Sequence, residues 1–553
     1  MLLINYAGSE GLNPTDDGVI LAQSWRILQG EIPHLDFISI RPVFSGLLHT
    51  VNFLFPFPLQ ITARYFVLFQ FFAIAFFVMQ FFRLRTITKL PTITELAILL
   101  ITWIFTIYNY NLYPWTTIDA LFCTAIALYF TELAFNKVFK FWYLSVGLFF
   151  FVLAALSRQT FALVAIAGWI WTFIRLVKNK EFLKIGIGSF FIGSIPILVY
   201  GFVLLKNHGV QDFYQQMMGR NEFFEYAVNG VYIKFLNAEN RWVFVSIGIA
   251  SLAIGIIRKT IITKKLFFSN VNVQKFSFFL ESSLALWLLI KSSLYFLSLA
   301  SDPNVLPYLP FWILTTMLGF SVLVNGESIK QQFVYIWILF ISWVSLISIG
   351  NNSPVFTFGI LSGAILFKYF YKYSKVTLLN ALGFKIVFFT GAIFFAFIGT
   401  FSQMQVNYRD VGKAQQTMNL KELNDKFGNI TTNENTWKYF NEADVIIKTM
   451  QLTNFEFCFM PDNPILYPIY RIPNPLSIDW PQSWEIANQT QRFEEELNAL
   501  INKKVVFIVQ KVNVRKLAQG FYPINENEYP YLQIIKNKCR QIKQYEYFVL
   551  YQQ

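Results

Sequence analysis

The sequence predicts a polytopic α-helical membrane protein with a C-terminal α/β domain outside the bilayer. Of its 553 residues, 55% are hydrophobic and only 14% are charged, and Phe alone fills 63 positions. Apolar runs of about 20 residues recur, each long enough to cross a hydrocarbon core of ~30 Å. This composition excludes a soluble globular protein. The net charge of +13 is spread over short loops, unlike the continuous basic patch of a nucleic-acid-binding protein.

We expect about twelve transmembrane spans. They lie near residues 60–82, 92–112, 114–135, 140–156, 159–177, 183–206, 241–257, 276–300, 306–325, 332–349, 354–371 and 384–402. Every second connection between them is rich in Lys and Arg, which is typical of cytoplasmic loops. The segment 1–58, the loop 207–240 and the residues after 402 are therefore expected outside the cytoplasm.

Three parts follow from this topology: a first outer loop at 1–58 with an acidic motif, a transmembrane helical domain at 59–402 that includes the outer loop 207–240, and an extracytoplasmic α/β domain at 403–553. Because no span precedes the first outer loop, we expect that an initial transmembrane helix is missing and that the intact protein has thirteen spans. The aromatic loop 207–240 is expected on the membrane surface, and a role as a lid stays open.

The last part alternates between helical and strand patterns. Amphipathic helices are predicted at Trp437–Met450 and Glu485–Ile501. Short apolar runs predict strands at Phe455–Met460, Val505–Val509 and Tyr545–Leu550. Helices that alternate with short strands indicate a small α/β domain.

Ionisable and polar residues of the first outer loop and of the outer ends of the spans are the candidate functional residues, because such groups are costly to keep near a bilayer. Carboxylates can deprotonate an attacking hydroxyl, and Arg can hold phosphate oxygens in a bidentate manner. The candidates are, in chain order, Asp16, Asp17, His34, Asp36, Arg41, Asp119, Arg158, Gln159, Lys291, Asp302, Asn304 and Tyr308.

Structural roles for several of these residues remain open. The acids at 16–17 and Asp119 are also typical of helix N-termini. Arg41 is within reach of a structural partner such as Asp36, and Arg158 is placed to snorkel to the bilayer edge. The histidines at 34 and 49 are more typical of hydrogen-bonding loop residues than of metal ligands. A disulfide between Cys458 and Cys539 is a further open alternative.

The order of these motifs resembles the GT-C membrane glycosyltransferases, in particular the relatives of protein O-mannosyltransferases and of the lipid A aminoarabinose transferase. In that family the first outer loop has an acidic pair, then Gly-x-x-Pro, then a basic residue before Pro. A Thr-Asp-like pair enters a later helix, and a basic residue ends an outer turn. The corresponding residues here are Asp16-Asp17, Gly30-Glu31-Ile32-Pro33, Arg41-Pro42, Thr117-Ile118-Asp119 and Arg158. The family's late Arg/Lys-Tyr-x-x-Pro-x-x-Pro pattern is partly matched at 304–310, which lacks the cation.

The resemblance implies an inverting transfer of one hexosyl or pentosyl unit from a polyprenyl-phosphate carrier to an extracytoplasmic glycan, lipid or protein acceptor. Asp16 corresponds to the general base, and Asp17 and Asp119 to residues that orient the substrate or hold a divalent cation. Whether a metal takes part stays open, and no other cofactor is implied. Arg41, Arg158 and His34 are expected to bind the donor phosphate. The expected substrate-lining residues are Asp36, Gln159, Asp302, Asn304, Tyr308 and Lys291.

Two other functions remain as alternatives. One is a transporter or flippase of lipid-linked glycan, although such proteins usually carry paired repeats and midplane charges, and the sequence has no such pairing. The other is a glycan enzyme of the O-antigen polymerase or ligase type. For all three functions the expected location is a bacterial plasma (inner) membrane, with the site on the extracytoplasmic side.

Overall fold

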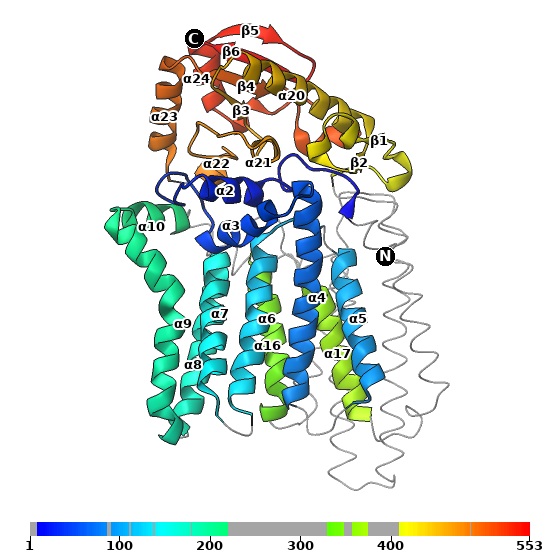
Figure 1. Ribbon diagram of the computed structural model, residues 1–553, viewed down its shortest axis with the longest axis vertical. Coiled ribbons are helices and arrows are strands. Elements are labelled where there is room, and N and C mark those ends of the chain that lie inside the picture. Colours follow the sequence, from blue (N-terminus) through cyan, green and yellow to red (C-terminus); the bar gives the residue numbers. More distant parts are fainter. Residues whose placement is uncertain are drawn as a thin grey trace.

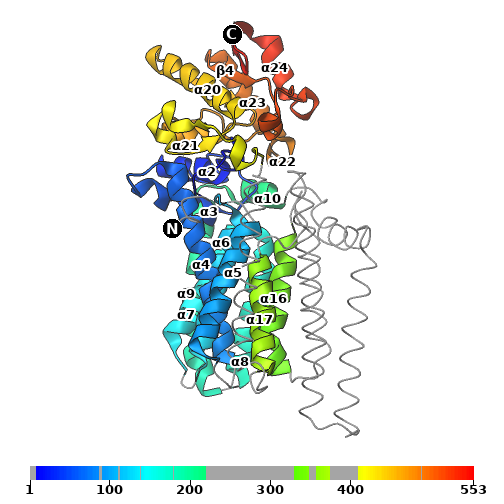
Figure 2. The same cartoon turned by 90° about the vertical axis from the view of Figure 1, so that its right-hand side faces the viewer.

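The computed structural model describes residues 8–85, 90–109, 112–136, 139–178, 180–218, 329–347, 357–373, 409–486 and 488–553. Figure 1 shows three layers along the long axis. Long helices form a bundle at one end, the C-terminal domain forms the other end, and two short N-terminal helices lie between them. The turned view in Figure 2 keeps the same order of layers.

The bundle consists of apolar helices that coincide with spans expected from the sequence. They are α4 (Leu59–Arg85), α5 (Thr92–Asn109), α6 (Thr116–Ala134), α7 (Phe141–Ser157), α8 (Ala162–Lys178), α9 (Lys180–Lys206), α16 (Ile329–Leu346) and α17 (Phe358–Tyr373). Among the described residues, four stretches are long and apolar enough to cross a membrane: Leu59–Arg85, Thr116–Ala134, Gln159–Lys178 and Phe182–Lys206. The expected spans at 241–257, 276–300, 306–325 and 384–402 lie outside the described residues.

Glycines allow some of these helices to approach closely. A Cβ atom at Gly147 of α7 would lie 2.3 Å from Oγ1 of Thr131 in α6, and one at Gly359 of α17 would lie 2.0 Å from Oγ1 of Thr106 in α5. Small residues at such crossings are typical of helices that pack within a membrane, where close backbone contact replaces the hydrophobic effect.

The layer between bundle and C-terminal domain is built by the first loop, which we define as residues 8–58. It contains α2 (Val19–Leu28), α3 (Val43–His49) and the short 3-10 helix η1 (Thr50–Leu54). The first four residues of α2 are all buried, because this helix is covered from both sides. The described part of the expected loop 207–240 is residues 207–218, which contains helix α10 (Val210–Met218).

The C-terminal domain is an α/β fold, as the sequence predicts. Its four-stranded sheet has the order β3-β4-β6-β5, with β3 and β4 parallel and the other neighbours antiparallel. The strands are β3 (Phe457–Met460), β4 (Val506–Gln510), β5 (Arg540–Gln544) and β6 (Phe548–Gln552). The helices are α20 (Glu434–Leu452), α21 (Leu466–Tyr470), α22 (Ser483–Ile486), α23 (Thr490–Asn502) and α24 (Tyr531–Lys538), and a short ladder joins β1 (Met418–Asn419) to β2 (Thr431–Thr432).

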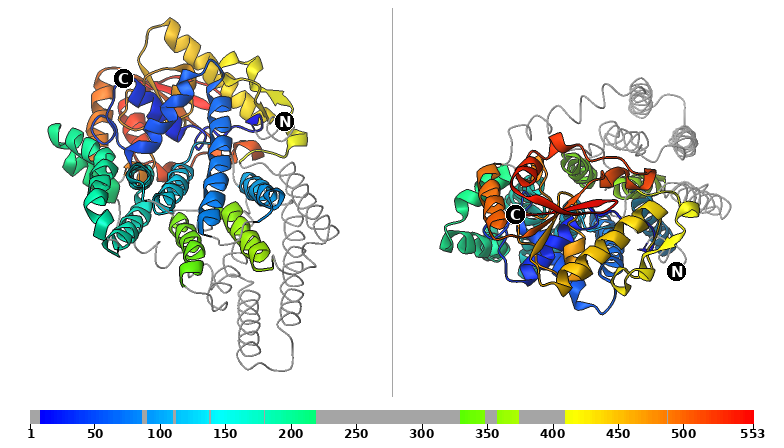
Figure 3. Two further views of the ribbon diagram at one scale, coloured as in Figure 1. Left: turned by 60° about the horizontal axis from the view of Figure 1, so that its bottom comes forward. Right: turned by 90° about the horizontal axis from the view of Figure 1, so that it is seen from above.

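Alternate residues of the inner strands enter different cores. Phe459 and Ile508 pack with α20, whereas Cys458 and Phe507 pack with α23 and α24. Seen from above in Figure 3, these helices lie on opposite sides of the sheet. A sheet that is covered on both faces needs apolar residues at consecutive positions, which explains why β3 and β4 are continuous apolar runs.

Three details of this domain differ from the sequence-based expectation. The helix expected at Glu485–Ile501 is divided into α22 and α23. The strand expected from Tyr545 begins at Phe548, because the carboxylate of Glu442 accepts the N–H groups of residues 546–548. Strand β5 was not expected, since all five residues are exposed and no apolar pattern marks it. Cys458 and Cys539 are not joined in a disulfide.

Candidate active site between the bundle and the C-terminal domain

The acidic pair lies in a tight turn before α2. Oδ1 of Asn13 accepts the backbone N–H groups of Thr15 and Asp16, at 2.9 Å each. Helix α2 begins only at Val19, with Gly18 at its N-cap and no side-chain cap. The acids therefore do not cap this helix, and the capping alternative does not describe them.

Asp17 is held by a cation from the bundle. Its Oδ2 accepts the backbone N–H of Asn13 at 2.8 Å, and Nη2 of Arg64 in α4 lies 3.3 Å from both carboxylate oxygens. Burial raises the pKa of Asp17, against the lowering effect of Arg64. These contacts of Asp17 hold the turn in one conformation, and the same turn carries Asp16. Asp17 therefore contributes to the position of Asp16.

Asp16 is paired with a cation from the C-terminal domain. Nη1 of Arg409 lies 2.7 Å from Oδ2 of Asp16, and the carboxylate is only 5% exposed. Arg409 adopts a left-handed backbone conformation with φ of 54°. Asp16 thus lies where the first loop meets the start of the C-terminal domain.

A further buried carboxyl group, that of Asp462, interacts electrostatically with Arg409. The sequence did not indicate it. Asp462 follows β3, and burial raises its pKa to about 6, against the lowering effects of Arg515 and Arg409. It accepts hydrogen bonds from Gln482 at 3.1 Å and from the Tyr529 hydroxyl at 3.2 Å. No sequence motif marks Asp462, because the partners that identify it come from distant segments.

The Asp462 segment lies directly against the acidic turn. The backbone N–H of Ile465 donates to the carbonyl of Pro14 at 3.3 Å. A Cβ atom at Gly18 would lie 2.3 Å from the backbone nitrogen of Ile465. Glycine is needed at position 18 because the two backbones touch.

Asp119 lies in the first turn of α6 and is fully buried. Its Oδ1 lies 3.0 Å from Nε2 of His49 and accepts a hydrogen bond of 2.7 Å from Nε2 of Gln70. Nδ1 of His49 lies 2.9 Å from Nδ2 of Asn52. These side chains come from α3, η1, α4 and α6, so the carboxylate is used to join elements and not to cap its own helix.

Arg158 and Gln159 join the bundle to the first loop. Arg158 ends α7 and donates to the hydroxyl of Thr117 and, at 2.9 Å, to the carbonyl of Ile347. Nε2 of Gln159 donates to the carbonyl of Ile40 at 3.0 Å. Arg158 is 8% exposed, so its guanidinium group lies inside the protein, with hydroxyl and carbonyl oxygens among its partners.

Arg41 forms a bidentate ion pair with a carboxylate of the C-terminal domain. Its Nη1 and Nη2 lie 2.6 and 2.7 Å from the two carboxylate oxygens of Glu485. The guanidinium group also lies 5.8 Å from the ring centre of Trp115 and 6.0 Å from that of Trp480. Asp36, the alternative partner, instead accepts the backbone N–H of Ile32 at 2.6 Å.

His34 is buried among residues of α9 and α10. Its Nδ1 lies 2.5 Å from the hydroxyl of Tyr200, and its carbonyl accepts a hydrogen bond of 3.0 Å from Gln216. Burial lowers the pKa of His34 to about 4. The ring is therefore neutral near pH 7 and is suited to hydrogen bonding.

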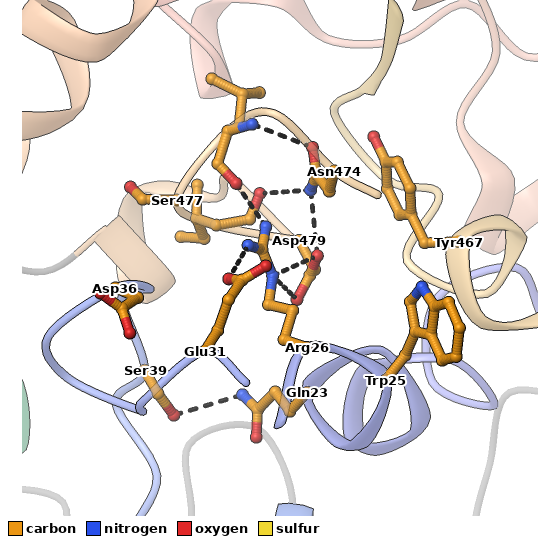
Figure 4. A network of polar contacts seen from close by, with 12 residues as sticks. Gln23, Trp25, Arg26, Glu31, Asp36, Ser39, Tyr467, Asn474, Ser477 and Asp479 are labelled. Atoms are coloured by element: carbon orange, nitrogen blue, oxygen red, sulfur yellow. Dashed lines mark hydrogen bonds and ion pairs between the residues drawn. The ribbon is translucent and has the colours of Figure 1, made fainter. Parts of the chain in front are cut away.

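The buried Arg26 network in Figure 4 was not expected from the sequence. Nε of Arg26 in α2 donates to both carboxylate oxygens of Asp479, at 3.0 and 2.9 Å, and Nη1 lies 2.7 Å from Glu31. Asn474 also donates to Asp479 at 2.9 Å. Together with the Arg41–Glu485 pair, this network attaches the segment 474–485 to the first loop.

The candidate residues thus fall into two neighbouring groups. Arg41, Asp119, Arg158 and Gln159 gather around the start of α6, through Trp115, Thr117 and Ile40. The acidic turn contacts α4 at Arg64, six residues before Gln70, a rise of about 9 Å along a helix. Lys291, Asp302, Asn304 and Tyr308 lie outside the described residues. In the described ranges, no three His, Cys, Asp or Glu side chains form a metal-binding cluster.

Comparisons with known proteins do not assign the chain to a family. No protein-family model matches the chain, and no curated protein is significantly similar to it. The crystal structure of ArnT from Cupriavidus metallidurans in the apo state is similar over 100% of this chain and 96% of that chain, with 11% sequence identity and a TM-score of 0.44. At that identity and TM-score, the similarity does not assign an activity to this chain.

Proposed function

We propose that the chain transfers a sugar from a polyprenyl-phosphate donor to an acceptor on the extracytoplasmic face of a membrane. The observation that carries this proposal is the position of the acids and guanidinium groups. Asp16 and Arg41 belong to the first loop, whereas Asp119 lies in the first turn of α6 and Arg158 follows α7. All four are buried or nearly buried where the first loop meets the apolar helices. A lipid-linked substrate needs this combination, because its tail requires apolar helices and its phosphate requires cations.

Asp16 is the proposed general base. A hydroxyl of the acceptor attacks C1 of the sugar, and its proton passes to the Asp16 carboxylate. The bond between the acceptor oxygen and C1 forms on one face while the bond from C1 to the phosphate oxygen breaks on the other, so the configuration at C1 inverts. The electron pair leaves with polyprenyl phosphate.

Arg41 and Arg158 are the proposed partners of that phosphate. Nη1 and Nη2 of Arg41 each lie close to one oxygen of the Glu485 carboxylate. Because a guanidinium group carries five N–H donors, Arg41 can also donate to phosphate oxygens while this pair stays intact. Arg158 is held by hydroxyl and carbonyl oxygens. Negative charge that develops on the leaving group is stabilised by such fixed cations.

The remaining candidates have supporting roles in this proposal. Asp17 positions the turn that carries Asp16. Neutral His34 and Asp36 belong to the first loop, and Gln159 donates to the carbonyl of Ile40 in the same loop. If a divalent cation takes part, Asp17 and Asp119 remain the candidate ligands, and no step above requires it.

The experiment that tests the proposal uses the purified full chain in detergent or nanodiscs. It is incubated with a panel of polyprenyl-phosphate sugars and mixed acceptors, and free polyprenyl phosphate is measured by mass spectrometry. Release of polyprenyl phosphate from one donor supports the proposal and identifies that donor. Intact donor that crosses the bilayer of proteoliposomes without cleavage would instead favour the flippase alternative.

A further inference from the structure

The hydrogen bonds of Asp119 are distributed unevenly over its two oxygens. Both Nε2 of His49 and Nε2 of Gln70 contact Oδ1, at 3.0 and 2.7 Å. Oδ2 is buried and has no partner among the residues that the structure describes. A buried carboxylate oxygen without a donor loses its hydration without replacement and so destabilises the folded state. Oδ2 is therefore the oxygen of Asp119 whose capacity to accept a hydrogen bond is not used by the described residues.

Asn52 determines which nitrogen of His49 carries the proton. Its amide nitrogen lies 2.9 Å from Nδ1 of His49, so Nδ1 accepts and the proton is on Nε2. That N–H then donates to Oδ1 of Asp119. The ring is further fixed by an edge contact with Phe66, with ring centres 5.3 Å apart. His49 is fully buried, so water does not compete for its proton.

The same cluster contains further amide oxygens without partners. Oε1 of Gln70 and Oδ1 of Asn52 are buried and have no hydrogen-bond donor within the described part of the chain. Together with Oδ2 of Asp119 they are three acceptors on one chain of hydrogen-bonded side chains, in which His49 joins Asn52 to Asp119 and Asp119 accepts from Gln70. Such a set matches a ligand with several hydrogen-bond donors, and a sugar ring with its hydroxyl groups is one.

We propose that His49 is a positioning residue of Asp119, and that Oδ2 of Asp119 accepts a hydrogen bond from a hydroxyl group of the donor sugar. This inference rests on the proposed function and extends it, because it assigns a sugar-recognising role to a group other than the general base. His49 and Gln70 hold Oδ1, and this fixes the direction of Oδ2. A carboxylate held on one side in this way is preorganised for a donor on the other side.

The test compares His49→Phe and His49→Gln with the wild type. Phe fills the space of the ring and removes the donor, whereas the Gln amide can still donate to Oδ1. The control is His208→Asn, because His208 is exposed on the surface and Asn tolerates its left-handed backbone, with φ of 56°. Binding of polyprenyl-phosphate sugars and of their monodeoxy analogues is measured alongside turnover.

The wild type is expected to bind one monodeoxy donor about 10–100-fold more weakly than the full donor, since a missing hydroxyl leaves a buried acceptor unpaired. His49→Phe should lose most of that discrimination, and His49→Gln and His208→Asn should retain it. Equal weakening of all donors by His49→Phe would show that His49 only supports the fold and would overturn the proposal.

Binding separates this inference from the proposed function. If donors bind and the discrimination behaves as expected but no sugar is transferred, the proposed function fails and the recognition by Asp119 stands. If the wild type binds no donor, or does not distinguish any monodeoxy analogue, the inference is wrong. A second readout is the ¹⁵N spectrum of the three histidines, in which an Nε2–H signal of His49 should shift in Asp119→Asn.

Discussion

Arg64 determines how the acidic pair is held, although it lies in the first long helix of the bundle. Its guanidinium group donates to the carbonyls of Gly8, Glu10 and Gly11, at 3.2, 3.1 and 2.7 Å, and to the carboxylate of Asp17. The side chain is 6% exposed. One buried cation therefore satisfies four acceptors of the turn next to the proposed general base.

Removing this cation should destabilise the protein and misplace Asp16. In Arg64→Met, three carbonyls and the Asp17 carboxylate lose the donor that Arg64 supplies, although Asp17 keeps the N–H of Asn13. Breaking a buried pair in this way typically costs about 3–5 kcal/mol. We expect a clear loss of thermal stability in detergent and a large loss of activity. Arg83→Met is the control, because Arg83 is 46% exposed and lies 4.0 Å from Glu95. Equal melting temperatures for wild type and Arg64→Met would contradict this role.

Asp462 should make stability depend on pH. Its pKa is raised from 3.8 to about 6 in the folded protein, so the folded state binds this proton more tightly than the unfolded state. The resulting stabilisation is present below pH 3.8 and is lost as the pH rises through about 6. Relative to wild type, Asp462→Asn should therefore gain roughly 1–3 kcal/mol between pH 4 and pH 8. Melting curves at both pH values test this, with the exposed Asp425→Asn as control; a constant difference would contradict it.

At this scale the sequence indicated the chemical groups but not their partners. Asp16, Arg41, Asp119 and Arg158 stand out because charges beside long apolar runs are unusual. Arg409 and Glu485 do not, since each is several hundred positions from the residue that it pairs with. His49 carries no local signal for its role, which depends on the carboxylate of Asp119 seventy positions later.

Helix α2 is the element that connects the acidic turn to the C-terminal domain. It starts at the close contact between Gly18 and Ile465 and ends near Arg26, which binds Asp479. Between them, Nε1 of Trp25 donates to the carbonyl of Ile472 at 2.9 Å. Both ends of this short helix are thus attached to the same domain.

A methyl group at position 18 should separate these two segments. In Gly18→Ala the new Cβ would lie 2.3 Å from the backbone nitrogen and 2.5 Å from Cα of Ile465, and backbone atoms cannot move aside cheaply. We expect a lower melting temperature and faster proteolysis between the first loop and the C-terminal domain. Gly201→Ala in α9 is the matched control, because nothing lies within 4 Å of its Cβ and Ala favours a helix by up to about 1 kcal/mol. Similar behaviour of the two variants would contradict the close contact.

Long elements were predictable and short polar ones were not. Helices such as α4 and α6 are predicted by the length of their apolar runs. Strands β3 and β4 are predicted by short continuous apolar runs, which arise because both faces of these strands are buried. Strand β5 is exposed along its whole length and has no such pattern. The break between α22 and α23 lies where Gln489 donates a hydrogen bond to Gln215 of α10. The hydrophobic pattern of the sequence cannot indicate such a contact between distant segments.

At the scale of the whole molecule, ion pairs attach the C-terminal domain to the first loop, which carries part of the candidate site. Arg26–Asp479, Arg41–Glu485 and Arg409–Asp16 all join the first loop to residues after 408. Such pairs are costly to break once they are removed from water. We infer that the domain is needed to hold the first loop in place, in addition to any contact with an acceptor.

Weakening one of these pairs should loosen the first loop. Asp479→Asn removes the charge opposite Arg26, and we expect amide hydrogen exchange in α2 to become at least tenfold faster, a change of about 1.4 kcal/mol in opening free energy. Glu434→Gln is the control, because the Glu434–Lys438 pair is exposed on the surface of α20 and such pairs contribute little. An unchanged exchange rate in α2 would show that the Arg26–Asp479 pair does not hold the first loop in place.

The most direct test of the proposed transfer is the release of polyprenyl phosphate by wild type, Asp16→Asn and the exposed control Asp425→Asn, measured by mass spectrometry with a saturating donor. A general base typically contributes 10²–10⁴-fold to the rate. Asp16→Asn is therefore expected to lower kcat by that factor while donor binding persists, and Asp425→Asn should match the wild type. Turnover by Asp16→Asn at the wild-type rate would contradict the assignment of Asp16 as the base.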